Sequence, residues 1–114
     1  MIVINNQEEM EPYYNEETNT YIFSENNRLI DIKIDFDLNI ECNIKAGNIN
    51  ACNINSGNIN ARDIKANNIN ANKISFNAVC FAYKTFVCNT IRGRRENSKY
   101  FCLDSDVVIK NQKS

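Results

Sequence analysis

The sequence predicts an all-β protein built around a small β-solenoid, in which the chain winds into stacked coils. An isoleucine recurs at every fifth position through the middle of the chain, strictly alternating residues precede this repeat, and aromatic strand-like segments follow it. The length of 114 residues favours one domain with a modest core. We expect an acidic arm or hairpin over 1–29, the solenoid over 30–79, and an aromatic, basic cap over 80–114 that closes the coil.

The repeat is defined by its anchors, which lie five residues apart: Ile44, Ile49, Ile54, Ile59, Ile64, Ile69, Ile74 and Val79. Two places after each anchor lies a second apolar or small residue: Ala46, Ala51, Ser56, Ala61, Ala66, Ala71, Phe76 and Phe81. Because side chains alternate along a strand, both sets share the inward face. The remaining residues are rich in Asn, Asp and Gly, which favour corners. A period of five fits neither a helix nor a flat strand.

The size of the coil follows from how many units close one turn. We expect four five-residue units to close a square coil, so that the repeat makes about two coils. Ile44 would then lie under Ile64, and Asn48 under Asn68, at the usual strand separation of about 4.8 Å. Stacked asparagines of this kind would form an amide ladder.

Three units, over residues 47–51, 52–56 and 57–61, place Asn before the large aliphatic anchor. In this they resemble the pentapeptide-repeat family, and the resemblance implies a four-sided, right-handed β-helix. The family usually has its small inward residue two places before the anchor, where this chain has Arg62 and Asn72, residues that do not suit a narrow apolar coil. Residues 78–103 also resemble the tails of repeat proteins from low-GC bacteria, phages and mobile elements.

Residues 30–46 alternate between apolar and polar side chains and predict a half-buried strand that enters the first coil. Its apolar positions are Ile30, Ile32, Ile34, Phe36, Leu38, Ile40, Cys42, Ile44 and Ala46. Residues 21–23 could pair with this strand across a turn at 24–27.

Composition argues against an enzyme. The chain has no histidine, which excludes Ser-His-Asp and Cys-His arrangements, and its three glycines are too scattered for a phosphate loop. None of the five cysteines forms a C-x-x-C pair, so we expect reduced thiols, no metal and no cofactor. Without a long apolar segment or a signal-peptide pattern, we expect a cytoplasmic protein that does not contact a membrane.

The charges are strongly divided along the chain. Residues 1–41 carry ten acidic and two basic side chains, a net charge of −8, whereas residues 42–114 carry four acidic and eleven basic ones, a net charge of +7. Residues two apart along a strand lie roughly 7 Å apart, which resembles the spacing of DNA phosphates. Four acidic residues share one face of the entry strand in this way: Asp31, Asp35, Asp37 and Glu41. The resemblance to the pentapeptide-repeat family, some members of which resemble duplex DNA and occupy gyrase, implies a matching role for this acidic face. We expect a phage or mobile-element inhibitor, a DNA mimic that engages a nucleic-acid-handling enzyme such as gyrase or a CRISPR nuclease.

Two alternatives stay open. A basic cluster could bind nucleic acid directly, with Tyr83 and Tyr100 nearby in sequence to stack on bases; it comprises Arg92, Arg94, Arg95 and Lys99. The chain could also be structural, because solenoid ends expose unpaired strand edges. For this reason we expect a homodimer formed through the aromatic residues Phe81, Tyr83 and Phe86.

Overall fold

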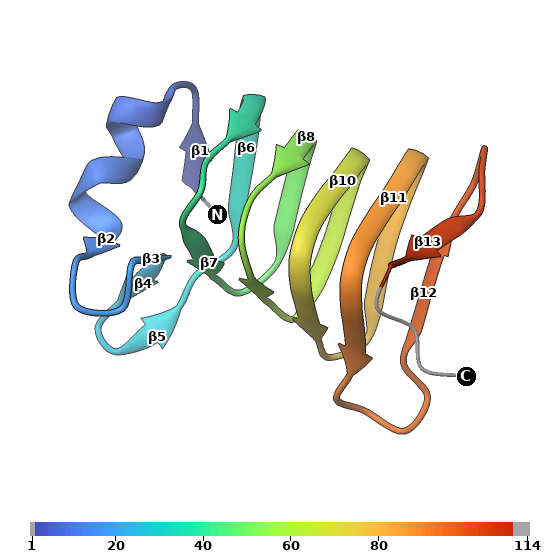
Figure 1. The fold of residues 1–114 in the computed structure, drawn as a ribbon. Coiled ribbons are helices and arrows are strands. Elements are labelled where there is room, and N and C mark those ends of the chain that lie inside the picture. The colour runs from blue at the N-terminus through green and yellow to red at the C-terminus, as the bar shows by residue number, and fades with distance from the viewer. Residues whose placement is uncertain (1, 111–114) are drawn as a thin grey trace.

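The computed structural model describes residues 2–110, which wind as a β-solenoid of about five turns. The molecule measures 40 × 26 × 24 Å, and its coils stack in chain order (Figure 1). The first part comprises β1 (Ile2–Ile4), the 3-10 helix η1 (Gln7–Tyr13), β2 (Tyr14–Asn15), β3 (Thr20–Ile22), β4 (Ser24–Glu25) and β5 (Arg28–Leu29). The coils comprise β6 (Ile32–Asn39), β7 (Asn43–Lys45), β8 (Ile49–Asn55), β9 (Ile59–Asn60), β10 (Asp63–Phe76), β11 (Val79–Gly93), β12 (Lys99–Cys102) and β13 (Val107–Ile109).

One turn of the central solenoid takes fifteen residues. β8 pairs in parallel with β10 so that Ile49 lies beside Ile64 and Ile54 beside Ile69, and β9 places Ile59 beside Ile74. Each turn therefore has three five-residue sides, which we call the first, second and third sides, beginning at Ile49, Ile54 and Ile59. The expectation of about two square coils, with Ile44 under Ile64, is wrong. The period sets the length of a side, whereas the number of sides depends on how sharply the corners turn.

The inward positions are as the repeat predicts. All seven anchor isoleucines are buried, and so are the small residues two places later: Ala46, Ala51, Ser56, Ala61, Ala66 and Ala71. Each central turn thus encloses three isoleucines that alternate with three small side chains. Arg62 and Asn72 lie at corners and are exposed, which resolves the conflict that they posed for a narrow apolar coil.

The regular spacing ends at β11. Its pairing with β10 places Cys80 beside Ile64 and Phe86 beside Ile69, offsets of sixteen and seventeen residues. Additional residues at two corners account for the longer offsets, and the shift turns Val79 outward, where it is 38% exposed. The expectation that Val79 continues the anchor series and that Phe81 follows it inward is therefore wrong.

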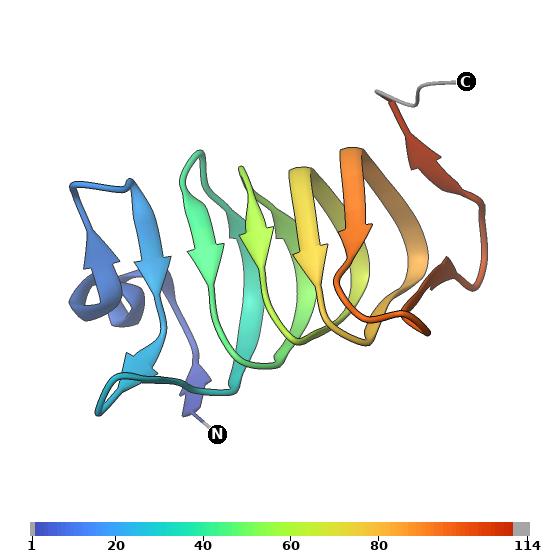
Figure 2. The same ribbon diagram turned by 90° about the horizontal axis from the view of Figure 1, so that it is seen from below.

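The N-terminal end of the solenoid is covered. β1 pairs in parallel with β6, and the 3-10 helix η1 lies at the same end of the stack (Figure 2). Met10 of η1 and Phe23 are both buried in the core. A hairpin does form after residue 23, but it joins the short strands β4 and β5 across Asn26 and Asn27, which adopt left-handed backbone angles. β3 pairs with β7, which is the last part of the predicted 30–46 strand, but it does so in parallel and not as a hairpin across the turn at 24–27. Residues 2–29 are thus a packed end of the fold instead of an arm.

The entry strand itself belongs to a full coil. β6 pairs with β8, and their register shifts between Ile34 and Asp37, where β6 passes from the first side to the second. Ile32, Ile34 and Leu38 are buried as the alternation predicts, whereas Phe36 at the corner is only partly buried. The alternating pattern runs through the corner, so it does not reveal the bend.

At the C-terminal end, the outer edge of the last coil is unpaired among residues 2–110. β12 and β13 continue the solenoid and pair in parallel with β11 alone. Within residues 2–110 no further strand or helix pairs with their outer edge. The predicted C-terminal cap is therefore not confirmed, because the residues assigned to it form one complete coil and part of another.

Candidate functional site

The open terminal coil gathers most of the large apolar side chains that solvent reaches. Among residues 2–110 these side chains are Val3, Tyr14, Val79, Tyr83, Tyr100, Phe101, Leu103 and Val108, and all but the first two belong to β11 or the coil after it. Leu103 is 66% exposed and Val108 is 49% exposed. Tyr100 lies beside the buried Cys80, yet it is 43% exposed because no later coil covers it. Clustered exposed apolar residues of this kind mark interaction surfaces.

An aromatic cluster extends this surface onto the first side. The Phe81 ring lies 4.6 Å from the ring of Phe101 and 4.6 Å from that of Tyr83, measured between centroids. The ammonium group of Lys65 lies 5.7 Å from the centre of the Tyr83 ring. These contacts hold Phe101 and Tyr83 in fixed orientations although both are exposed, so less conformational entropy is lost when a partner binds.

Two of the three residues expected at a dimer interface lie in this cluster. Tyr83 is exposed and Phe81 is partly exposed, whereas Phe86 is fully buried and packs inside the coil. The prediction that Phe86 contacts a partner subunit is therefore wrong. The sequence did not lead us to assign Phe101, Leu103 and Val108 to any contact surface, and Tyr100 was expected only to stack on bases beside the basic cluster. Their signal was available: they are the last strand-like segments of a solenoid, and the last coil has an unpaired edge.

The backbone of β12 adds unpaired polar groups to the apolar surface. Lys99 N donates to Ala78 O at 2.8 Å, and Leu103 N donates to Ala82 O at 3.0 Å. Successive residues of a parallel strand direct their backbone groups to opposite neighbours. The N–H and C=O groups of Tyr100 and Cys102 therefore point away from β11, toward the open end. An extended segment could pair with them by adding a strand to the sheet.

The four acidic residues of the predicted mimic do not share one face. Asp31 precedes the first side, and its Oδ1 accepts from Asn48 N at 2.9 Å. Asp35 lies at the corner where β6 bends, Asp37 lies on the second side, and Glu41 lies at the next corner. Together they ring the first coil, because the corner interrupts the straight line that alternation suggested. They do share the N-terminal end of the solenoid.

Asp37 also terminates a ladder of side-chain hydrogen bonds along the second side. Thr85 Oγ1 donates to Asn68 Oδ1 at 2.8 Å, and Asn68 Nδ2 donates to Asn53 Oδ1 at 2.6 Å. Asn53 Nδ2 then donates to Asp37 Oδ1 at 2.7 Å. The ladder crosses four coils in one direction and ends on a carboxylate, which strengthens the last bond by its charge. Asp37 is therefore a structural residue. The expected stack of Asn48 over Asn68 is wrong, because the turn takes fifteen residues.

The basic cluster is divided between structural and free side chains. The guanidinium of Arg94 reaches back over earlier coils: its Nε donates to Asn77 Oδ1 at 2.7 Å and its Nη2 to Ala61 O at 2.6 Å, and its Nη1 also donates to Asn60 Oδ1. Arg92, Arg95 and Lys99 are exposed. All three guanidinium nitrogens of Arg94 already donate hydrogen bonds within the protein. The basic cluster therefore leaves three side chains, not four, available to contact nucleic acid.

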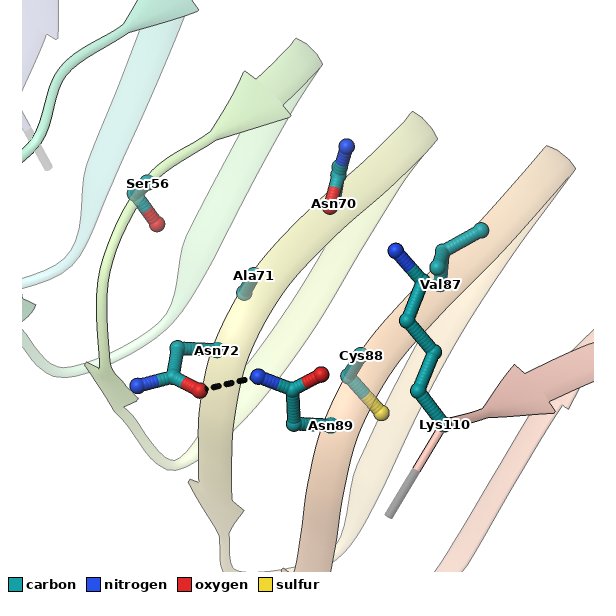
Figure 3. Close-up of a pocket in the computed structure, with 8 residues that line it drawn as sticks. All are labelled: Ser56, Asn70, Ala71, Asn72, Val87, Cys88, Asn89 and Lys110. Carbon is teal, nitrogen blue, oxygen red and sulfur yellow. Dashed lines mark hydrogen bonds between the residues drawn. The ribbon is translucent and has the colours of Figure 1, made fainter.

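A small polar cavity of about 230 Å³ lies where the second side turns into the third (Figure 3). It is lined by Ser56, Asn70, Ala71, Asn72, Val87, Cys88, Asn89 and Lys110. The Ser56 hydroxyl is buried without a hydrogen-bond partner among the described residues, and Asn89 Nδ2 donates to Asn72 Oδ1. Burial raises the pKa of the Cys88 thiol. The thiol therefore stays protonated and unreactive, so the lining offers hydrogen bonds and no activated nucleophile.

Residues 2–110 contain no group of three His, Cys, Asp or Glu side chains arranged to hold a metal ion. No helix within the described part of the chain combines the length and the apolar character that crossing a bilayer requires. In comparisons with known proteins, the chain matches no protein-family model, no curated protein and no solved structure.

Proposed function

We propose that this protein is a non-enzymatic protein-binding module that presents its open C-terminal coil to a partner. The observation that carries the proposal is the coincidence of two features at one end. Exposed apolar side chains, including Phe101 at 45% exposure, lie beside the unpaired backbone groups of Tyr100 and Cys102. Apolar anchors supply affinity, and an unpaired strand edge supplies direction and register. The chain has no histidine, and the described cavity is lined by groups suited to binding and not to catalysis.

Site-specific photo-crosslinking tests this proposal directly. A photoreactive phenylalanine analogue in place of Phe101 should form a discrete protein adduct in the native host, identified by mass spectrometry. The same analogue in place of Asn55, which is exposed on the second side, is the matched control and should give none. Addition of unlabelled protein should compete for the adduct, whereas its Phe101→Asp variant should not. Equal labelling at both positions, or none at Phe101, would refute the proposed contact surface.

A second candidate function uses the opposite end of the solenoid. Because the coils stack in chain order, the division between −8 and +7 along the sequence becomes a separation of charge along the 40 Å molecule. This observation favours an acidic end that docks on the basic cleft of a nucleic-acid-handling enzyme, such as gyrase or a CRISPR nuclease, in a phage or mobile-element inhibitor. A cytoplasmic location would suit this role and agrees with the five free cysteines.

The inhibitor hypothesis is tested with residues that the fold does not use. Asp35 and Glu41 are both exposed and neither side chain makes a hydrogen bond within the described residues, so Asp35→Lys with Glu41→Lys should spare folding. Inhibition of gyrase supercoiling or of nuclease cleavage should be lost. A control variant, Glu96→Lys with Asp106→Lys, makes the same charge change at two exposed residues of the other end and should inhibit as before. If both variants inhibit the enzyme equally, the acidic end of the solenoid does not contact that enzyme.

A further inference from the structure

We infer that the open coil binds a second copy of this chain, end to end about a twofold axis. The inference rests on the proposed function and names its partner. The charge order of the terminal strand is the first argument. Lys99 begins β12 and Asp104 follows it, both exposed, with an apolar segment between them. A strand that is basic at its start and acidic after its end is complementary to an antiparallel copy of itself.

The free backbone groups fix the register of such a pair. Tyr100 and Cys102 are the residues of β12 whose N–H and C=O groups point outward, so they must face one another across the twofold axis. The axis then passes through Phe101, and the Phe101 rings of the two copies meet beside it. Lys99 of one copy then faces Leu103 of the other, one residue before Asp104, so the long Lys99 side chain reaches the Asp104 carboxylate at the bend that follows β12. The symmetry makes this ion pair twice.

Only an arrangement that joins two C-terminal ends fits the fold. Head-to-tail stacking would need an open N-terminal end, but η1 covers that end and buries Met10 there. An end face bounded by the 26 and 24 Å dimensions would bury roughly 1,000 Å² over both copies, at the lower limit for a specific interface. We therefore expect a reversible dimer with a dissociation constant on the order of micromolar.

A charge exchange tests both the partner and the register. Sedimentation velocity over a range of concentrations should show a reversible monomer–dimer equilibrium for the wild type. Lys99→Asp alone and Asp104→Lys alone should each weaken the dimer about tenfold, because each places two pairs of like charges at the interface. The double variant Lys99→Asp with Asp104→Lys restores both pairs and should return the dissociation constant to within about threefold of the wild type. Lys45→Asp, an exposed change on β7, is the control and should have no effect.

The outcomes separate this inference from the function on which it rests. Failure of the double variant to recover affinity overturns the twofold pairing through β12. A wild type that stays monomeric at millimolar concentration overturns the second copy as partner. If Phe101 then still crosslinks to another protein, the proposed function stands without the dimer. Loss of both the dimer and the crosslink removes the open coil as a binding surface altogether. Circular dichroism of every variant confirms that the fold is retained.

Discussion

Replacement of Gly57 by alanine would insert a methyl group at a point where two adjacent coils touch. A Cβ at this position would lie 2.6 Å from Asn43 Oδ1 and 3.0 Å from the backbone oxygen of Cys42. Asn43 Oδ1 accepts a hydrogen bond from Asn58 N at 2.8 Å, so it cannot withdraw without breaking that bond. Gly57 does not adopt a positive φ, and therefore space, not backbone conformation, requires glycine here. The same arrangement recurs two corners earlier, where Gly47 allows Asp31 to approach Asn48 N.

The cost of this substitution follows from two opposing terms. Loss of the bond leaves a partly buried backbone donor without its acceptor, which costs about 1–3 kcal/mol. The greater stiffness of alanine in the unfolded chain returns about 0.4–1 kcal/mol. We therefore expect Gly57→Ala to lower the free energy of unfolding by about 1–2 kcal/mol, and the melting temperature by about 4 °C for each kcal/mol.

A double-mutant cycle separates this mechanism from general crowding. Asn43→Ala removes both the clashing oxygen and the hydrogen bond, so Gly57→Ala made in that background should change stability by less than about 0.5 kcal/mol. Urea unfolding followed by far-UV circular dichroism provides the four free energies. Equal costs in the two backgrounds, or a gain of stability in the wild-type background, would refute the reasoning.

Three further predictions concern the core, the ladder and the thiols. Phe86→Ala should cost about 3–5 kcal/mol in urea unfolding because its side chain is fully buried, whereas Phe101→Ala should leave the stability of the dilute monomer nearly unchanged. Asn68→Ala removes both hydrogen bonds that Asn68 makes in the ladder and should lower the free energy of unfolding by about 1–2 kcal/mol. An unchanged free energy of unfolding would show that the ladder does not stabilise the fold. Burial raises the pKa of the Cys80 thiol above its ordinary value of 9.0. Since the unfolded thiol ionises first, stability should be full below about pH 9 and should fall by about 1 kcal/mol at pH 10, and Cys80→Ala should reduce that fall.

The regular part of the fold could be predicted because its signal is local. A five-residue period and strand alternation identify the inward residues, and Ile54, Ala61 and Ile69 are buried accordingly. The number of sides could not be predicted, because it depends on corner angles that the period does not encode. The shift at Val79 comes from additional corner residues, which only the pairing of β10 with β11 reveals.

The candidate site was only partly visible for a similar reason. Tyr83 was identified because it is aromatic and lies beyond the repeat. Phe86 was assigned wrongly, because two additional corner residues bring it beside the buried Ile69, and the sequence does not show where those residues fall. The prediction of a single acidic face was wrong because the alternation from Asp35 to Asp37 continues through a corner of the coil. Local pattern thus identifies strands, whereas the position of a surface depends on how successive coils stack.

Amide hydrogen exchange, measured residue by residue at several protein concentrations, tests the open coil most directly. The amides of Tyr100 and Cys102 should exchange freely in dilute solution, because no strand pairs with that edge within the described residues. As the concentration rises and the ends associate, both amides should become protected, and Phe101→Asp should abolish that protection. Protection of Tyr100 and Cys102 that is already present in dilute solution and independent of concentration would contradict the account.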